Sequence, residues 1–325
     1  MNDFFRIPLG TWVEGGIDFI TVAFGGVFDL IKLLISSLYD VVNFVFTAPP
    51  FWVVIVIFAV LAFMARGWVF SLGSTLGFVL IVGLNQWDNA MDTLTLVLIA
   101  ASIAVVISVP LGILAAKYRT VSNIMKPVLD FLQTMPAFVY LIPALTLFRV
   151  GDVPGVVATV VFALAPGVRL TELGIRGVDK EIVEAGQAFG SSPSRILRQI
   201  QLPLAMPSIM AGINQVIMLS LSMVVIGAMV GASGLGKPVI QSLSRIDVAL
   251  GFEAGLAVVI LAIFLDRLTA SFGLGKGYFR FVIDSFPSRS GKPDDASSAD
   301  LADADTINSS SPTVDEPAEL TPPSR

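Results

Sequence analysis

The chain has 325 residues, of which 55% are apolar and only 14% are charged, against about 25% charged residues in a soluble domain. This composition predicts an all-α polytopic membrane protein. Because the chain contains no cysteine and no histidine, it can form no disulfide, use no thiolate nucleophile, and offer neither the commonest metal ligand nor the commonest general base.

Residues 1–50 are predicted to form an extracytoplasmic amphipathic helix that lies in the membrane interface. Apolar residues occupy the positions between the charged ones. The alternative to an interfacial helix is an eighth membrane span over residues 17–38 that carries charged residues. The charged residues that share one side of a helical wheel are Glu14, Asp18, Asp29, Lys32 and Asp40.

Residues 51–272 are predicted to form the transmembrane permease domain. A helix that spans a membrane needs roughly 20 mostly apolar residues, and some of the apolar runs in this domain are shorter than that. The seven predicted spans are Phe51–Ala65, Trp68–Leu84, Leu94–Ala116, Val128–Phe148, Pro154–Val168, Met206–Val230 and Ala249–Leu265.

Lysine and arginine are concentrated in three of the connecting segments, residues 117–126, 169–205 and 267–292, whereas residues 85–93 carry only Asp88 and Asp92. Basic loops remain on the cytoplasmic side of a membrane. Seven spans would place all three basic segments on that side, so we expect the N-terminus outside and the C-terminus in the cytoplasm.

Polar and aromatic residues inside the spans are candidates for the translocation path, because ionisable groups are costly in a membrane and usually serve a function there. Pro136 and Pro143 can break the fourth span. Asp266 and Arg267 are expected to form an ion pair at the end of the last span. The candidate path residues are Asp130, Gln133, Phe138, Tyr140, Asn214, Gln215 and Glu253.

The stretch GASGLGKP, residues 231–238, nearly matches the nucleotide-binding P-loop, G-x-x-x-x-G-K-[ST]. Pro238 replaces the hydroxyl residue that holds Mg²⁺, and an apolar helix precedes the stretch in place of a buried strand. The expected topology also puts it outside the cell, away from ATP. We therefore predict an external turn in which Gly231, Gly234 and Gly236 let the backbone bend sharply.

Residues 184–203 read EAGQAFGSSPSRILRQIQLP. The pattern E-A-x-x-x-x-G, nine residues and I-x-L-P resembles the EAA signature of bacterial ABC importer permeases, and only Gly186 departs from it, standing where a second alanine is usual. The resemblance implies a role in coupling to an ATPase for Glu184, Ala185, Gly186, Gly190, Ile200, Leu202 and Pro203.

Elementary physics favours the same interpretation. A short helix over residues 179–190 would have acidic residues near its start, where they favour the helix dipole, and Gly190 would end it. The small residues Ala185, Gly186 and Ala188 would let another protein's backbone approach closely. Pro203 is expected to end the segment that follows.

Longer stretches, residues 132–144, 201–236 and 251–269, are similar to the glycine betaine/proline-type permeases of osmoprotectant uptake systems. The resemblance implies a type I ABC importer-like fold in the bacterial inner membrane. It implies a homodimer of the permease, two separate ATP-binding subunits that carry the ATP and Mg²⁺, and an extracytoplasmic solute-binding protein. It implies no cofactor, catalytic site or nucleic-acid partner for this chain.

Residues 285–325 are predicted to form a disordered, acidic cytoplasmic tail, because residues 293–325 hold eight acidic residues against one basic residue and few large apolar ones. One alternative for the whole chain is an ion-coupled secondary transporter of small zwitterionic solutes, which would need carboxylates in the membrane. Another is a membrane enzyme, which the absence of histidine, cysteine and clustered acids disfavours.

Overall fold

A computed structural model describes residues 8–273, and every regular element among them is helical. The predicted all-helical class is therefore confirmed, while the predicted tail at residues 285–325 lies outside the described residues. In chain order the elements are α1 (Leu9–Ala23), α2 (Gly25–Thr47), α3 (Phe51–Arg66), α4 (Trp68–Gly83), α5 (Trp87–Lys117), α6 (Arg119–Thr134), α7 (Ala137–Phe148), α8 (Asp152–Arg176), α9 (Lys180–Ala188), α10 (Pro193–Ile196), η2 (Leu197–Gln201), α11 (Leu202–Gly227), η3 (Ala228–Val230), α12 (Gly236–Arg245) and α13 (Val248–Gly273).

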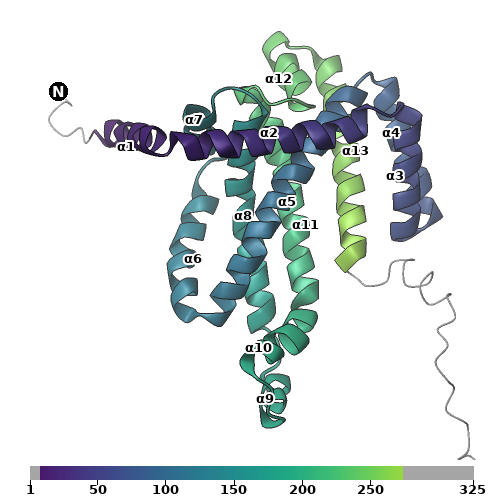
Figure 1. Cartoon of the computed structure of the whole chain (residues 1–325). Coiled ribbons are helices and arrows are strands. Elements are labelled where there is room, and N and C mark those ends of the chain that lie inside the picture. Colours follow the sequence, from purple (N-terminus) through teal and green to yellow (C-terminus); the bar gives the residue numbers. More distant parts are fainter. Residues whose placement is uncertain (1–7, 274–325) are drawn as a thin grey trace, which may run out of the picture. The chain divides into compact units, whose positions relative to one another are not determined.

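Helices α5, α8 and α11 pack side by side in an upright bundle (Figure 1). They approach closely because small residues lie where they meet. A β-carbon on Gly167 of α8 would come within 2.3 Å of Ser108 Oγ on α5, and one on Gly212 of α11 would lie 3.7 Å from the Gly167 Cα atom. Close approach at small residues is a usual way for membrane helices to associate.

Helix α2 lies across the upright helices, near the end opposite to α9 and α10 (Figure 1). It has three different faces: Ile35 is buried against the bundle, Lys32 and Asp40 lie on a polar face, and Leu34 and Val41 are exposed apolar residues. A helix that touches protein, water and lipid at once is expected to show this pattern. Helix α2 is also long and apolar enough to span a membrane, and it lies across the upright helices and not alongside them.

The number of candidate spans among the described residues is smaller than the seven predicted. Five helices are long and apolar enough to cross a membrane, or six if the bent pair α6 and α7 counts as one, and the five include α2, which was not among the seven predicted spans. Helices α3 and α4 have 16 residues each. At 1.5 Å per residue each covers roughly 24 Å, less than the hydrocarbon thickness of about 30 Å.

The predicted span Val128–Phe148 is not a continuous helix. Helices α6 and α7 are bent by 100° relative to each other, and Met135 between them has an extended backbone with ψ of 137°. Pro136 explains this break, since a proline disfavours a helical conformation in the residue before it and has no N–H to donate. The expected break at Pro136 is confirmed, whereas Pro143 lies inside α7.

The basic segment 117–126, expected to be a loop, is mostly helical. Tyr118, with an extended backbone, is the one residue between α5 and α6. Helix α6 then places Leu129 and Ser122 against the bundle and leaves its other polar residues exposed, together with Ile124, Val128 and Phe131. Average hydropathy does not identify such an amphipathic helix, so the sequence analysis assigned its first half to a loop.

Candidate functional site

The predicted coupling helix is present as α9, at the lower end of the bundle in Figure 1. The Asp179 carboxylate caps it by accepting a hydrogen bond of 3.0 Å from the Glu181 backbone N–H. At the other end, the Gly190 N–H donates to the Gln187 carbonyl at 2.8 Å and the Ser191 N–H to the Gly186 carbonyl at 3.1 Å. This is a Schellman motif, and Gly190 has the positive φ, +75°, that such a motif requires.

Gly186 packs against other residues of the same chain and is therefore not available to a partner. It is buried, and a β-carbon there would lie 2.8 Å from Ile200 Cδ1 and 3.5 Å from Ile196 Cγ1. The two halves of the signature therefore pack on each other, with Ile200 filling the space beside Gly186. The expectation that Gly186 offers a surface to another backbone was wrong, whereas Ala185 and Ala188 are exposed.

Pro203 does not end the segment after α9, contrary to the sequence analysis. Residues 193–230 form one long helical rod, in which residues 197–201 are π-helical and the Leu202 N–H donates to the Leu197 carbonyl. The wider π turn comes directly before Pro203, whose ring and missing N–H disturb a regular helix. Helix α8 also continues to Arg176, so the segment between α8 and this rod comprises residues 177–192 only. It is shorter than the predicted loop, residues 169–205.

Phe189 was not among the coupling residues predicted from the sequence. This side chain is 91% exposed and stands at the end of α9, next to Gly190. An aromatic side chain with this exposure is available to enter a pocket of a partner protein. The sequence feature that could have identified Phe189 is a large apolar residue directly before the glycine that ends a polar helix.

A polar cluster with a buried carboxylate, Glu172, lies where α8 approaches α9. Ser122 Oγ of α6 donates to Glu172 Oε1 of α8 at 2.7 Å, and Arg176 pairs with the same carboxylate at 3.1 Å. The Arg176 guanidinium also donates to the Ala115 carbonyl of α5 at 2.7 Å. These bonds join three helices beside the coupling loop, and none of these four residues was a candidate from the sequence.

Among the candidate path residues, Asp130 and Gln133 lie on the exposed side of α6. The Arg169 guanidinium of α8 donates to the Asp130 carboxylate, and both side chains are accessible, 37% and 65% exposed. A charge pair on the open faces of two adjacent helices can line an aqueous path. Arg169 was assigned to the basic loop from the sequence and lies in α8 instead.

The two aromatic candidates differ. The Tyr140 side chain is buried, and its hydroxyl donates to the Leu132 carbonyl across the bend between α6 and α7. Tyr140 therefore stabilises the bend. Phe138 is 52% exposed, so it is free to contact a solute, a lipid or another subunit.

Asn214 and Gln215 also have different surroundings. Asn214 Nδ2 donates to Asp266 Oδ1 at 2.9 Å, and Thr269 Oγ1 donates to Asn214 Oδ1 at 2.5 Å, so Asn214 joins α11 to α13. Gln215 is exposed on α11, and Glu253 is half-buried on α13. Asp266 bonds to Asn214, and its expected ion pair with Arg267 is not found among the described residues.

In the part of the chain that the structure describes, no hydrogen bond or ion pair joins any two of the seven candidate path residues. The accessible ones are Asp130, Gln133, Phe138 and Gln215. A single chain therefore presents separate polar positions on open helix faces, and does not form a closed solute site from them.

The predicted glycine turn at the other end of the bundle is held by two neighbouring helices. Gly231 and Gly234 have φ of +91° and +97°, which agrees with the expected bend. Asp152 Oδ1 accepts from the Ser233 N–H at 2.6 Å, and Thr93 Oγ1 accepts from the Leu235 N–H at 2.8 Å. The polypeptide before the turn is helical and so cannot form the strand of a P-loop.

Gly236 serves a different purpose from the other two glycines of the turn. It is the first residue of α12, and a β-carbon there would come within 2.4 Å of the Val225 carbonyl oxygen. Close packing alone explains Gly236, whereas Gly231 and Gly234 combine a positive φ with close packing: a β-carbon would lie 2.5 Å from Val150 Cγ1 in the first case and 2.4 Å from Thr93 Oγ1 in the second.

Residues 108–273 match the family described as binding-protein-dependent transport system inner membrane component. The glycine betaine/carnitine transport permease protein GbuB of Listeria monocytogenes is 49% identical over 82% of this chain and 95% of its own length. The glycine betaine transport system permease protein OpuAB of Bacillus subtilis is 47% identical over 83% and 96%. The glycine betaine/proline betaine permease protein ProW of Escherichia coli is 43% identical over 82% and 75%.

Among solved structures, the inward-facing MetNI methionine ABC transporter has a similar fold, with a TM-score of 0.52 and 21% identity over 58% of this chain and 95% of that chain. At this identity the likeness concerns the fold alone. Together with the coupling helix and the matched residues, the comparisons lead to one conclusion. The chain belongs to the family of binding-protein-dependent transport system inner membrane components, the permease subunits of ABC importers.

Proposed function

We propose that this permease imports glycine betaine, proline betaine and related solutes together with a partner ATPase. The observation that carries the proposal is identity of 43 to 49% to three permeases of such systems, over at least 82% of this chain. The coupling segment supports it, because α9 ends at a glycine with positive φ and projects beyond the long helices. ATP hydrolysis belongs to the partner subunit.

The partner ATPase is proposed to contact the outer face of α9. Glu184, Ala185 and Phe189 are all exposed there, whereas Gly186 and Ile200 hold the helix against α10 and η2. Leu202 and Pro203 continue the rod into α11. We propose that two copies of the permease pair, that each copy receives one ATPase, and that a solute-binding protein delivers the solute at the opposite end.

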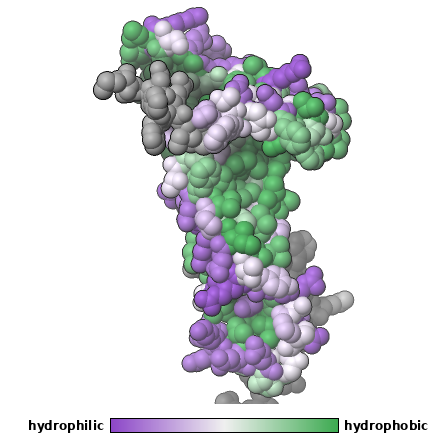
Figure 2. Space-filling model, turned by 90° about the vertical axis from the view of Figure 1, so that its left-hand side faces the viewer, coloured by the Kyte–Doolittle hydropathy of each residue, from purple (hydrophilic) through white to green (hydrophobic). Residues whose placement is uncertain are grey.

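The end of the bundle that carries α9 is proposed to face the cytoplasm. Arg119, Arg176, Lys180, Arg195 and Arg198 lie in or beside the helix ends there, and basic residues favour the cytoplasmic side. Figure 2 shows largely apolar side chains along the middle of the upright bundle and polar ones at its lower end, as a membrane position requires. On this orientation α2 lies at the outer surface, as an interfacial helix.

The test is solute uptake by proteoliposomes that contain the permease, its ATPase and its binding protein. We expect labelled glycine betaine to enter only with ATP on the ATPase side and with binding protein, and to continue entering when ion gradients are dissipated. Labelled methionine is the control and should stay outside, since the likeness to the methionine transporter is one of fold. Uptake driven by an ion gradient without ATP would instead identify a secondary transporter.

A further inference from the structure

A cavity of about 220 Å³ lies between α2 and the start of α8, at the end of the bundle opposite to α9. That volume equals the share of roughly seven water molecules in the liquid. It suits a solute of fewer than ten heavy atoms and not a larger metabolite. The cavity is lined by residues from α2, from the turn between α7 and α8, and from α8 itself.

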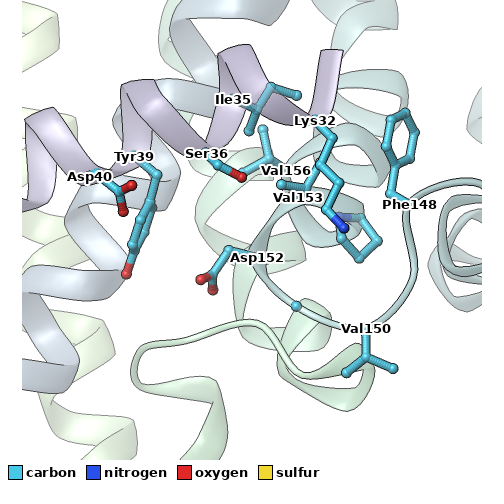
Figure 3. Close-up of a pocket in the computed structure, with 12 residues that line it drawn as sticks. Lys32, Ile35, Ser36, Tyr39, Asp40, Phe148, Val150, Asp152, Val153 and Val156 are labelled. Carbon is cyan, nitrogen blue, oxygen red and sulfur yellow. The ribbon is translucent and has the colours of Figure 1, made fainter. Parts of the chain in front are cut away.

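The charged residues that line this cavity are one cation, Lys32, and two carboxylates, Asp40 and Asp152. Figure 3 shows Lys32 reaching down from α2 beside Phe148, while the Asp152 carboxylate points into the same space from the start of α8. Among the described residues no carboxylate lies within 4 Å of the Lys32 ammonium. Asp152 Oδ1 accepts from the Ser233 N–H, and no hydrogen bond from a described residue reaches its other oxygen.

Uncharged lining residues complete a site of mixed character. Ser36 contributes a hydroxyl group, and Tyr39 and Phe148 contribute aromatic rings. The Tyr39 hydroxyl itself donates to Asp92 Oδ1 at 3.3 Å and accepts from Asn43 Nδ2 at 3.0 Å. Phe148 is held in place by an edge-to-face contact with Phe28, at 5.7 Å between ring centres. An aromatic ring beside a carboxylate attracts an organic cation, while the Lys32 ammonium attracts a carboxylate or phosphate at the other side.

We propose that this cavity binds a small zwitterion, with the anionic group at Lys32 and the cationic group between Asp152 and Tyr39. The identification of the occupant as the transported betaine rests on the proposed function. A phospholipid headgroup such as phosphatidylethanolamine has the same paired charges, so the lipid composition must be varied in the test. The site belongs to the permease itself and requires no binding protein.

The experiment measures binding of labelled glycine betaine to the full-length permease–ATPase complex in nanodiscs, without the binding protein. We expect saturable binding of one solute per permease, weakened at least tenfold by Lys32→Met and by Asp152→Asn. Asp29→Asn, which changes a charge on α2 outside the cavity, should bind like the wild type. In nanodiscs of phosphatidylglycerol alone the solute binds freely, and competition by added phosphatidylethanolamine would identify a headgroup as the second occupant.

Two results would overturn the site. One is a wild-type complex without saturable binding; the other is binding that Lys32→Met and Asp152→Asn leave unchanged. A fall in thermal stability of both variants without any solute binding to the wild type would show that the two charges only stabilise the fold. Uptake by the complete wild-type system is measured in parallel. Absent uptake contradicts the proposed function, whereas normal uptake without binding contradicts this inference alone.

Discussion

A β-carbon would have unrelated physical consequences at two glycines of the segment around α9. Gly190 has φ of +75° and no atom within 4 Å of the position where a β-carbon would stand, so its requirement is conformational. Gly186 has ordinary helical geometry, but a β-carbon there would meet the tip of Ile200. The sequence pattern marked both positions, and only the structure separates the backbone requirement from the packing requirement.

We expect Gly190→Asp to abolish uptake while the permease still inserts into the membrane. A β-carbon at positive φ costs about 1 kcal/mol, too little to unfold the chain, but the new carboxylate lies at the proposed contact with the ATPase. The measurement is uptake together with ATP hydrolysis stimulated by loaded binding protein, in reconstituted complexes. Normal uptake at normal expression would refute the coupling role.

Gly186→Ala is the matched control for Gly190→Asp. The added methyl group meets only the flexible end of Ile200, and alanine is the residue that the signature usually has at this position. We expect uptake within about twofold of the wild type. A complete loss would mean that the fit between Gly186 and Ile200 is itself part of the coupling contact.

Glu172 is a residue that the sequence did not mark and that the structure shows to be buried among polar partners. It is 7% exposed and interacts with both Ser122 and Arg176. We expect Glu172→Gln to lower the melting temperature of the purified complex, because hydrogen bonds to charged groups contribute roughly 1.5–3 kcal/mol each. Ser122→Ala removes one bond and keeps the ion pair, so its melting temperature should fall less. Equal effects would show that the charge of Glu172 does not matter.

The helices illustrate what an amino-acid sequence can and cannot predict. Long apolar runs predicted α5, α8 and α13 because burial in lipid demands such composition. Helix α6 was missed in part because an amphipathic helix has average hydropathy near that of a loop. The continuation of helix through Pro203 was missed because a π turn accommodates the proline, and such local adjustments have no sequence pattern.

The break between α6 and α7 gives a prediction that can be measured as a distance. The chain has no cysteine, so Val128→Cys and Thr146→Cys place spin labels at these two positions only, and the distance within one chain is read from a complex in which a single permease copy carries them. A straight helix would separate the two Cα atoms by about 27 Å at 1.5 Å per residue, and the 100° bend makes the separation shorter. We expect Pro136→Ala to lengthen or broaden the measured distance, since it restores the missing N–H.

Pro143→Ala is the control for this distance, because Pro143 lies inside α7 and away from the bend. It should leave the distance between the labels unchanged. If Pro136→Ala also left it unchanged, packing around the bend would be its cause, including the hydrogen bond from the Tyr140 hydroxyl to the Leu132 carbonyl.

Helix α8 connects the two ends of the bundle. Its first residue, Asp152, holds the glycine turn through the Ser233 N–H, and its last residue, Arg176, holds the Ala115 carbonyl beside the coupling loop. Between them, Gly167 and Gly212 keep α8 in close contact with α11. Helices α8 and α11 therefore connect the segment around α9 with the glycine turn at the opposite end of the bundle.

The class of the molecule was predictable from composition, and the helix α9 with its terminal glycine from spacing. The surroundings of Asp130, Phe138 and Gln215 were not predictable, because these residues lie on open helix faces. The ion pair of Asp130 with Arg169 was not predictable either, since the two residues are 39 positions apart in the sequence and Arg169 was assigned to a loop.

The proposed orientation can be tested by labelling with a membrane-impermeant thiol reagent, without background because the chain contains no cysteine. Ser122 is not suitable for a cysteine substitution in this experiment, because its side chain is fully buried. Ser244 on α12 and Ser194 on α10 are both exposed, at opposite ends of the bundle. We expect Ser244→Cys to react in intact spheroplasts. Ser194→Cys should react only after the membrane has been opened and the ATPase removed, because it belongs to the basic end that is proposed to face the cytoplasm and the ATPase. Labelling of Ser194→Cys in intact spheroplasts would reverse the orientation, and with it the placement of α2 on the outer surface.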